Sequence, residues 1–238
     1  MVCRITQRGQ CNPLIRCIGN PGCGKTVLAG AAVSELPARI TSRDIALAYF
    51  FFNESTTNKK TIINAYRSIL AQISQTASTN ETLLNALTYA MRGSSQRVAS
   101  LGNLRDLLCI AANCIPNIYI IVDAVDECES PDGFVADIIR LFSGTSTKLL
   151  LFSRPSVRNL QRAVQEEYCI TINQELNRAD IHLYCSGRIS GLIEADLLPA
   201  DIPPVSEMAD WMVNGADGMF LWARLMFIYL ESEALAPP

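Results

Sequence analysis

The chain has 238 residues, of which 49% are hydrophobic and 18% charged, and its formal net charge is -3. This length suits one α/β domain, or one domain with a small appendage, and the apolar content is enough for a sizeable core. The acidic balance argues against a protein that binds nucleic acid through bulk electrostatics, and no apolar run reaches the 18 residues of a membrane span.

Cysteine usage indicates the compartment. The nine cysteines are irregularly spaced and include no C-x-x-C pair. An odd number without a pattern favours reduced thiols in a cytoplasmic protein over a disulfide framework or a zinc site. The N-terminus also lacks the long apolar core of a signal peptide. His182 is the only histidine, which excludes a His-rich metal site.

Apolar strands and amphipathic helices alternate along the first three quarters of the chain. Strands are expected at residues 13–18, 44–52, 118–123, 148–152 and 168–172. Helices are expected at residues 26–36, 61–74, 81–91, 101–113, 134–142 and 157–165. Pro37 is expected to stop the first helix. The alternation predicts an α/β fold, with a five-stranded parallel sheet flanked by helices on both faces.

The remaining residues are expected to be helical. Asn177 and Asp180 have the spacing of a cap for a helix that ends near Ile189. A short helix is expected at residues 205–213, and Asp217 has the side chain of an N-cap for a helix over residues 218–230. That last helix is apolar on almost every side, which predicts burial against the sheet domain or against a partner outside this chain.

Residues 19–26 read GNPGCGKT, a complete G-x-x-x-x-G-K-[ST] phosphate-binding loop between a strand and a helix. Glycines allow the backbone N–H groups to turn around phosphate oxygens, Lys25 reaches the β- and γ-phosphates, and the Thr26 hydroxyl ligates Mg²⁺. The helix that begins near Lys25 directs its positive end at the same anion. The nucleotide-binding residues are predicted to be Gly19, Asn20, Pro21, Gly22, Cys23, Gly24, Lys25, Thr26 and Val27.

Charged residues follow two of the predicted strands. Asp123 ends the most β-branched strand, where it is expected to hold Mg²⁺ together with Thr26. Asp126 and Glu127 follow, and either is a candidate to polarise an attacking water as a general base. Arg154 comes directly after the next strand and is a candidate to sense or stabilise the γ-phosphate. The first 175 residues are therefore expected to form a P-loop NTPase domain and residues 176–238 a helical extension.

Three segments together resemble one family. The phosphate loop, IIVDAVDEC at residues 120–128 and LLLFSRP at residues 149–155 are similar to the NACHT domain of the STAND class of signal-transducing P-loop NTPases. The fungal members found in heterokaryon-incompatibility and innate-immunity-like receptors are the most similar. The acidic block at residues 123–128 is the most specific of the three, and the resemblance extends over roughly residues 12–230.

The resemblance implies a nucleotide-operated switch, closed with ADP and oligomeric with ATP. Its cofactors would be ATP or ADP with Mg²⁺, and its partners copies of itself or adjacent receptor domains. It also implies Asp123 as the Walker B acid, Asp126 and Glu127 as catalytic acids, and Arg154 as the sensor arginine. No winged-helix domain, repeat array or effector domain is recognisable in these residues, which are expected to be a core module.

Two other functions remain open from the residues alone. One is a P-loop kinase that transfers phosphate to a small acceptor, with Arg154, Arg158 and Arg162 near a lid. The other is a module that holds nucleotide without turnover. A GTPase is disfavoured because the N-K-x-D motif is missing, and an ABC ATPase because L-S-G-G-Q is missing.

Overall fold

A computed structural model describes residues 14–39, 45–76, 80–93, 99–198 and 201–234. Contacts within the chain divide it into two compact units. The first comprises residues up to Ile18 together with Thr26–Ile170, and the second comprises Gly19–Lys25 together with the residues from Thr171 onward. The phosphate loop is thus grouped with the C-terminal helices.

The sheet has the predicted five parallel strands. They are β1 (Leu14–Gly19), β2 (Ile45–Phe51), β3 (Asn117–Asp123), β4 (Lys148–Ser153) and β5 (Cys169–Ile172), in the order β2-β3-β4-β1-β5. Because β4 lies between β1 and β3, Ser153 is aligned with Ile18 at the carboxyl end of β1. The end of β4 therefore separates the strand before the phosphate loop from the strand that ends in Asp123.

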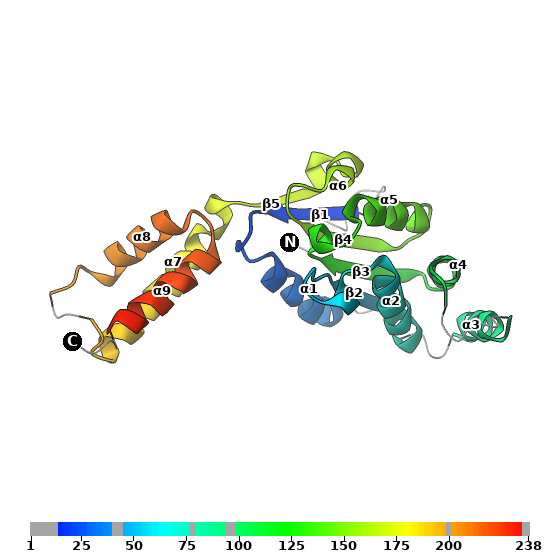
Figure 1. Cartoon of the computed structure of the whole chain (residues 1–238), viewed down its shortest axis with the longest axis horizontal. Helices are drawn as coiled ribbons and strands as arrows, with labels where there is room; N and C mark the ends of the chain where they lie inside the picture. The colour runs from blue at the N-terminus through cyan, green and yellow to red at the C-terminus, as the bar shows by residue number, and fades with distance from the viewer. Residues whose placement is uncertain (1–13, 40–44, 77–79, 94–98, 199–200, 235–238) are drawn as a thin grey trace. The chain divides into compact units, whose positions relative to one another are not determined.

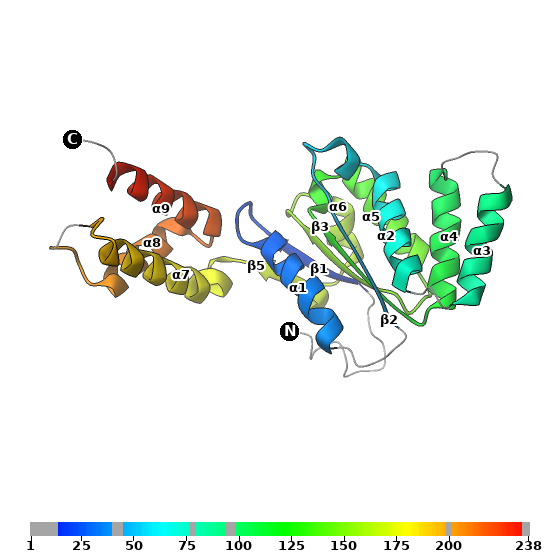
Figure 2. The ribbon, with the colours of Figure 1, turned by 90° about the horizontal axis from the view of Figure 1, so that it is seen from below.

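Helices cover both faces of the sheet in the first unit. They are α1 (Lys25–Arg39), α2 (Ile62–Thr76), α3 (Glu81–Gly93), α4 (Leu101–Cys114), α5 (Pro131–Phe142) and α6 (Arg158–Ala163), with short 3-10 helices η2 (Thr57–Lys59), η3 (Val125–Glu127) and η4 (Glu166–Tyr168). Helices α2, α4 and α5 lie on one face and α1 lies along the other, while α3 packs on α4 (Figures 1 and 2). The α/β fold is as predicted.

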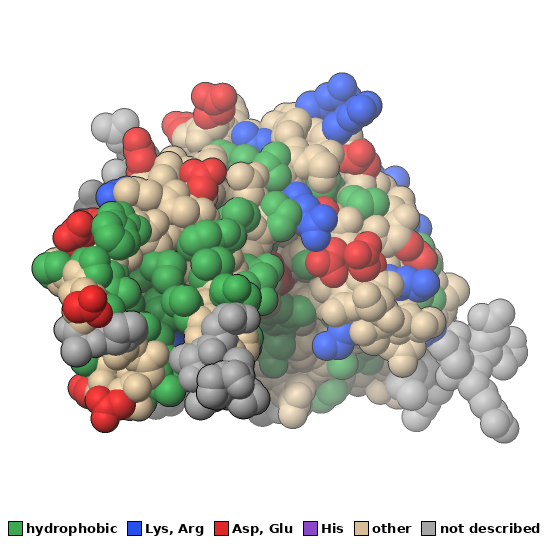
Figure 3. Space-filling view, turned by 60° about the vertical axis from the view of Figure 1, so that its left-hand side comes forward, with side chains coloured by type: hydrophobic (Ala, Val, Ile, Leu, Met, Phe, Trp, Pro, Cys, Tyr) green, Lys and Arg blue, Asp and Glu red, His purple; other side chains and the backbone are tan. Residues whose placement is uncertain are grey.

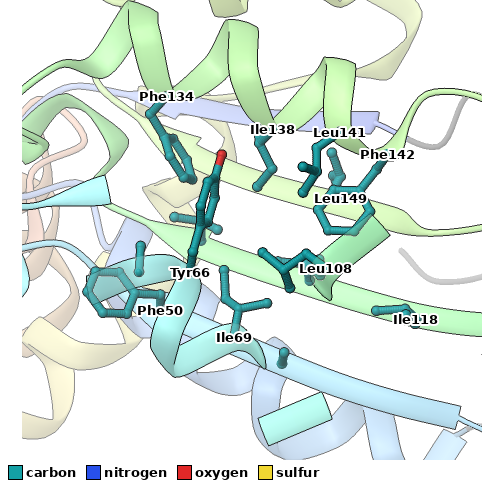
Figure 4. Close-up of a cluster of buried hydrophobic side chains, with 14 of the residues drawn as sticks. Phe50, Tyr66, Ile69, Leu108, Ile118, Phe134, Ile138, Leu141, Phe142 and Leu149 are labelled. Atoms are coloured by element: carbon teal, nitrogen blue, oxygen red, sulfur yellow. The ribbon is translucent and has the colours of Figure 1, made fainter. Parts of the chain in front are cut away.

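The main core lies between the sheet and helices α2, α4 and α5 (Figure 4). Strand side chains alternate between faces, so Ile118 and Ile120 both point to this core and are fully buried. The ring of Phe134 from α5 contacts the ring of Phe52 edge to face, with centroids 5.1 Å apart. This packing fixes α5 over the ends of β2 and β3, where the acidic loop begins.

Asp137 of α5 ties three helices together inside this core. Its carboxylate accepts hydrogen bonds from the Tyr66 hydroxyl (2.9 Å), Arg105 Nε (2.8 Å) and Arg140 Nη2 (2.8 Å). Burial acts to raise the pKa of Asp137, but the three hydrogen bonds outweigh it and hold that pKa below its usual value. Burial, and then the neighbouring Asp137 charge, raise the pKa of Tyr66.

The first helix differs from its prediction. Pro37 does not stop α1, which continues to Arg39. Proline removes one N–H donor and disturbs the turn before it, but in the last turn few helical residues follow whose hydrogen bonds a kink could break. The predicted end was wrong because the sequence does not show whether a proline ends a helix or lies within its last turn.

The second unit contains three packed helices, α7 (Gln174–Glu194), α8 (Val205–Ala216) and α9 (Phe220–Ala234) (Figure 1). Their shared core includes Ile181, Cys185, Ile189, Val213 and Phe227. No helix in the described ranges combines the length and hydrophobicity needed to cross a bilayer.

The caps of these helices are not the predicted ones. Asn173, not Asn177, caps α7, its side chain accepting from the Leu176 N–H. Asp217 lies at the C-terminal end of α8 in the left-handed conformation, and α9 begins at Phe220. Asn and Asp are favoured both at caps and in left-handed turns, so the residue types alone did not separate these roles.

Helix α9 is not buried all round within this chain, and burial of its remaining side against a partner stays a prediction. Ala223 and Phe227 are fully buried, whereas Leu221, Leu225 and Tyr229 are each at least half exposed. These exposed residues recur every four positions and share one side of the helix. Hydrophobic side chains gather on the surface of the helical unit (Figure 3).

Candidate functional site

The phosphate loop depends on its glycines in two ways. Gly22 and Gly24 have φ angles of 74° and 96°, a region that other L-residues adopt only with strain. A Cβ on Gly19 would lie 2.6 Å from Cys23 Sγ, and one on Gly22 would lie 2.7 Å from the Cβ of Leu221. The loop therefore closes on itself and on α9 only because these positions carry no side chain.

Lys25 is held by the loop that it follows. Its ammonium donates to the carbonyl oxygens of Gly19 (2.8 Å) and Asn20 (2.9 Å) and lies 3.8 Å from Cys23 Sγ. Lys25 is also the first residue of α1, whose N-terminal amides add partial positive charge. The loop thus brings one full positive charge and a helix N-terminus to the same few residues.

Two hydrogen bonds join the loop to helices of its own unit. The Asn177 side chain donates to the Cys23 carbonyl (2.8 Å) and to the Gly218 carbonyl (2.9 Å). The Leu221 N–H, in the first turn of α9, donates to the Gly22 carbonyl (3.2 Å). Asn177 is only 7% exposed, so these two carbonyls supply the partners that a buried amide needs.

The predicted metal-binding residues both lie in the first unit. Asp123 is the last residue of β3 and is 2% exposed, whereas Thr26 and Val27 are exposed in the first turn of α1. Ala124 follows Asp123 with a left-handed backbone (φ 53°, ψ 44°) and starts the 3-10 helix η3. This turn directs Asp126 and Glu127 away from the strand axis, at a conformational cost of about 1 kcal/mol.

Asp126 and Arg154 form a bidentate pair. The backbone N–H of Arg154 donates to Asp126 Oδ1 (2.8 Å), and Arg154 Nε is 3.1 Å from Asp126 Oδ2. Glu127 is less engaged: its Oε2 accepts from the Glu54 N–H (3.3 Å), and its Oε1 is 4.0 Å from Arg154 Nη2. The structure thus brings together all three predicted catalytic residues and gives them different partners.

Cys128 closes this loop as a packing residue. It is 6% exposed within the main core, and burial raises the pKa of its thiol to about 11. The thiol is therefore neutral at physiological pH and is not a nucleophile. Cys23 and Cys185 are likewise buried cysteines that form no disulfide.

The residues present fit a nucleotide with Mg²⁺. Positive-φ glycines and a lysine at a helix N-terminus are the donor set that phosphate oxygens require. A hydroxyl and a buried carboxylate at a strand end are hard oxygen ligands of the kind that Mg²⁺ prefers.

Sequence reasoning missed two residues near this chemistry. Ser153 is fully buried at the end of β4 and donates its hydroxyl to the Arg154 carbonyl (2.9 Å). Asn177 was assigned to a cap. A signal was present in its spacing: Asn177, Ile181, Cys185 and Ile189 form one i, i+4 stripe, so a polar residue extends an apolar face by one turn.

One family model matches the chain. The model described as "Nephrocystin 3, N-terminal" matches residues 3–154, more than half of the chain. No curated protein matches the sequence significantly.

Two solved structures are similar at low identity. The Orc1 protein of Aeropyrum pernix, solved in complex with DNA, is 14% identical with a TM-score of 0.48, covering 92% of this chain and 53% of its own. A Walker-type ATPase of Pyrococcus abyssi is 13% identical with a TM-score of 0.46, covering 93% and 68%. The chain thus spans about half the length of the Orc1 chain.

Proposed function

Because the chain belongs to the family described as Nephrocystin 3, N-terminal, we propose that it is a NACHT-type nucleotide-binding module. It binds ATP or ADP together with Mg²⁺ and acts as a slowly hydrolysing signalling switch. The observation that carries this proposal is the loop after β1, in which Gly22 and Gly24 adopt positive φ and Lys25 is held against the loop. Such a loop followed by a lysine at the start of a helix is the arrangement of a Walker A phosphate-binding loop.

Each site residue has a role in this proposal. The loop amides and Lys25 bind the phosphates, and Thr26 and Asp123 hold Mg²⁺. Bound nucleotide supplies the reactive γ-phosphoryl group. Glu127 orients a water molecule and accepts its proton at Oε1, which lies beyond direct hydrogen-bonding distance from Arg154. Arg154 lies in the same cluster of residues and stabilises negative charge.

The wider role is that of a receptor component. We propose that the module belongs to a cytoplasmic, fungal incompatibility or innate-immunity-like receptor and signals through copies of itself or adjacent domains. The resemblance of the acidic block at residues 123–128 supports this assignment. The half-exposed apolar residues of α9 support a surface that meets a protein partner.

The decisive experiment compares two lysine substitutions in the whole chain. Lys25→Ala should abolish binding of Mg-ADP and Mg-ATP, measured by calorimetric titration. Lys59→Ala, which removes an exposed lysine, is the matched control and should bind as the wild type does. Unchanged affinity in Lys25→Ala would refute nucleotide binding at this loop.

One observation favours a module without turnover as the second candidate. Both carboxylate oxygens of Asp126 are already engaged by Arg154, so only one of the two predicted acids is available to act on water. If Glu127 does not do so, the module holds nucleotide without turnover. Glu127→Gln should therefore stop hydrolysis without weakening ATP binding. If the wild type binds ATP but releases no phosphate over hours, the non-hydrolysing module is correct. Faster phosphate transfer to an added acceptor than to water would indicate a kinase.

A further inference from the structure

The phosphate loop receives hydrogen bonds from α7 and α9, two elements that are synthesised long after it. Asn177 bonds the Cys23 carbonyl, and the Leu221 N–H bonds the Gly22 carbonyl. All these residues lie within one compact unit. Because the bonds go to carbonyl groups, they determine which way the loop peptides face.

Each held carbonyl also determines the direction of the N–H group that follows it in the chain. In a trans peptide the C=O of one residue and the N–H of the next point in opposite directions, and the described residues contain no cis peptide. When Asn177 holds the Cys23 carbonyl, the Gly24 N–H points away from α7. When Leu221 holds the Gly22 carbonyl, the Cys23 N–H points away from α9.

The loop itself gives a check on this direction. The Cys23 N–H is directed across the loop at the Asn20 carbonyl, in a long bond of 3.4 Å. The side of the loop opposite α9 is therefore its interior. This is the side on which backbone N–H groups of such a loop receive an anion.

Asn177 is a buried amide on the apolar side of α7. Asn177 occupies the first buried position of α7, one turn before Ile181, Cys185 and Ile189. A buried carboxamide without partners is destabilising, and an apolar side chain would pack there at no such cost. Asn177 instead donates both hydrogen bonds to carbonyls, one in the loop and one at Gly218, in the turn before α9.

We propose that Asn177 is a positioning residue for the phosphate loop: it holds the Cys23 carbonyl outside the loop, so that the Gly24 N–H faces the phosphate. This inference rests on the proposed nucleotide binding and extends it to a residue of the helical unit. It also makes the first turn of α7 sensitive to whether phosphate is bound, since coupling between two sites is reciprocal.

The test uses two substitutions and a neighbour as the control, in the whole chain. Asn177→Ala removes both hydrogen bonds. Asn177→Asp keeps the shape but places a carboxylate oxygen against two carbonyl oxygens. Arg178→Ala changes the next residue, which is half exposed and pairs with Asp210 on α8 rather than with the loop. Calorimetric titration with Mg-ADP gives the dissociation constant of each variant.

We expect Asn177→Ala to weaken Mg-ADP binding about tenfold, as loss of one well-placed hydrogen bond does. Asn177→Asp should weaken it further, and Arg178→Ala should leave it unchanged. The Gly24 amide resonance should shift on addition of Mg-ADP in the wild type and shift less in Asn177→Ala. A purely structural role would lower thermal stability but would not change this resonance in the folded, ligand-bound protein.

A second measurement needs no variant. In the wild type, Mg-ADP should slow amide hydrogen exchange at residues 174–180 as well as at residues 19–26. Unchanged exchange at residues 174–180, or wild-type affinity in both Asn177 variants, would overturn the inference while Lys25→Ala still abolishes binding. If the wild type itself binds no nucleotide, the proposed function fails first, and the two failures are distinguished.

Discussion

Arg154 binds Asp126 through both its backbone and its side chain: the N–H donates to one carboxylate oxygen at 2.8 Å, and Nε lies 3.1 Å from the other. The pair joins the loop after β3 to the loop after β4, two strands that are neighbours in the sheet. A carboxylate with both oxygens occupied is poorly placed to accept a proton from water. Its geometry suits holding the arginine.

This pairing predicts strong coupling in catalysis. Asp126→Ala and Arg154→Ala should each lower kcat for ATP hydrolysis about 10- to 100-fold, and the double variant should be no worse than the poorer single one. The Arg154 side chain is 48% exposed but the Asp126 side chain only 9%, so loss of either partner should lower folding stability by about 1–3 kcal/mol. Steady-state phosphate release measures the first effect and urea unfolding the second.

The exposed Glu129 of the same loop provides the control, since Glu129→Ala should be neutral. If the two losses in kcat multiply, Asp126 acts independently of Arg154, as expected of a general base.

The left-handed backbone of Ala124 predicts that glycine is tolerated at this position and that valine destabilises the fold. Its left-handed backbone is strained for any residue with a Cβ, and more so for a β-branched one. Ala124→Gly relieves the strain but loses a methyl contact and adds freedom to the unfolded chain, so its stability should stay within about 1 kcal/mol of the wild type. Ala124→Val should destabilise by about 2 kcal/mol or more. A valine variant with the wild-type midpoint in urea would show that this turn relaxes freely.

The Asp137 cluster predicts acid sensitivity. Because the folded-state pKa is lowered, the charged carboxylate contributes stability above its unfolded pKa of about 3.9 and loses it as pH falls through the folded value. Asp137→Asn should flatten the fall in unfolding free energy below about pH 4. Asp137→Ala should cost about 1–3 kcal/mol at neutral pH, because it leaves the buried Tyr66 hydroxyl without its acceptor, whereas Arg105 and Arg140 can turn to solvent.

The control for this prediction is the exposed Asp106 of α4. Asp106→Asn should retain the wild-type pH profile of thermal unfolding. An identical acid limb in Asp137→Asn would mean that other carboxylates dominate acid unfolding.

Two helical glycines of the second unit predict opposite outcomes for the same change. A Cβ on Gly187 of α7 would meet no atom within 4 Å, so Gly187→Ala should stabilise the helix by about 0.5–1 kcal/mol. A Cβ on Gly215 of α8 would lie 2.6 Å from the Trp222 ring, so Gly215→Ala should destabilise by about 1–3 kcal/mol. Thermal unfolding of the two variants should shift in opposite directions, and equal shifts would contradict the packing around Trp222.

Much of the fold could be predicted because its signals are local. The β-branched run at β3 and the apolar period of α2 each identify their element without reference to the rest of the chain. The order of the strands could not be predicted in this way. Nothing in the periodicity of β4 says that it lies between β1 and β3, and the contact of Arg154 with Asp126 follows from that placement.

The helical part of the site was harder to predict for a chemical reason. Asparagine serves equally well as a cap and as a buried donor, and Asn173 and Asn177 stand one helical turn apart. Only the tertiary structure separates them, since one bonds the local Leu176 N–H and the other a carbonyl in the phosphate loop. The apolar pattern of α9 predicted burial, but because it has no polar face it did not indicate which side of the helix packs within this chain.

The hydrogen bond from Asn177 to Cys23 spans 154 residues of chain. At about 5–20 residues per second, the ribosome needs about 8–30 s to synthesise that interval. During this time a nascent chain already exposes the loop but does not yet have the amide that orients it. The segment of the site that is synthesised first is therefore among the last to acquire its tertiary partners.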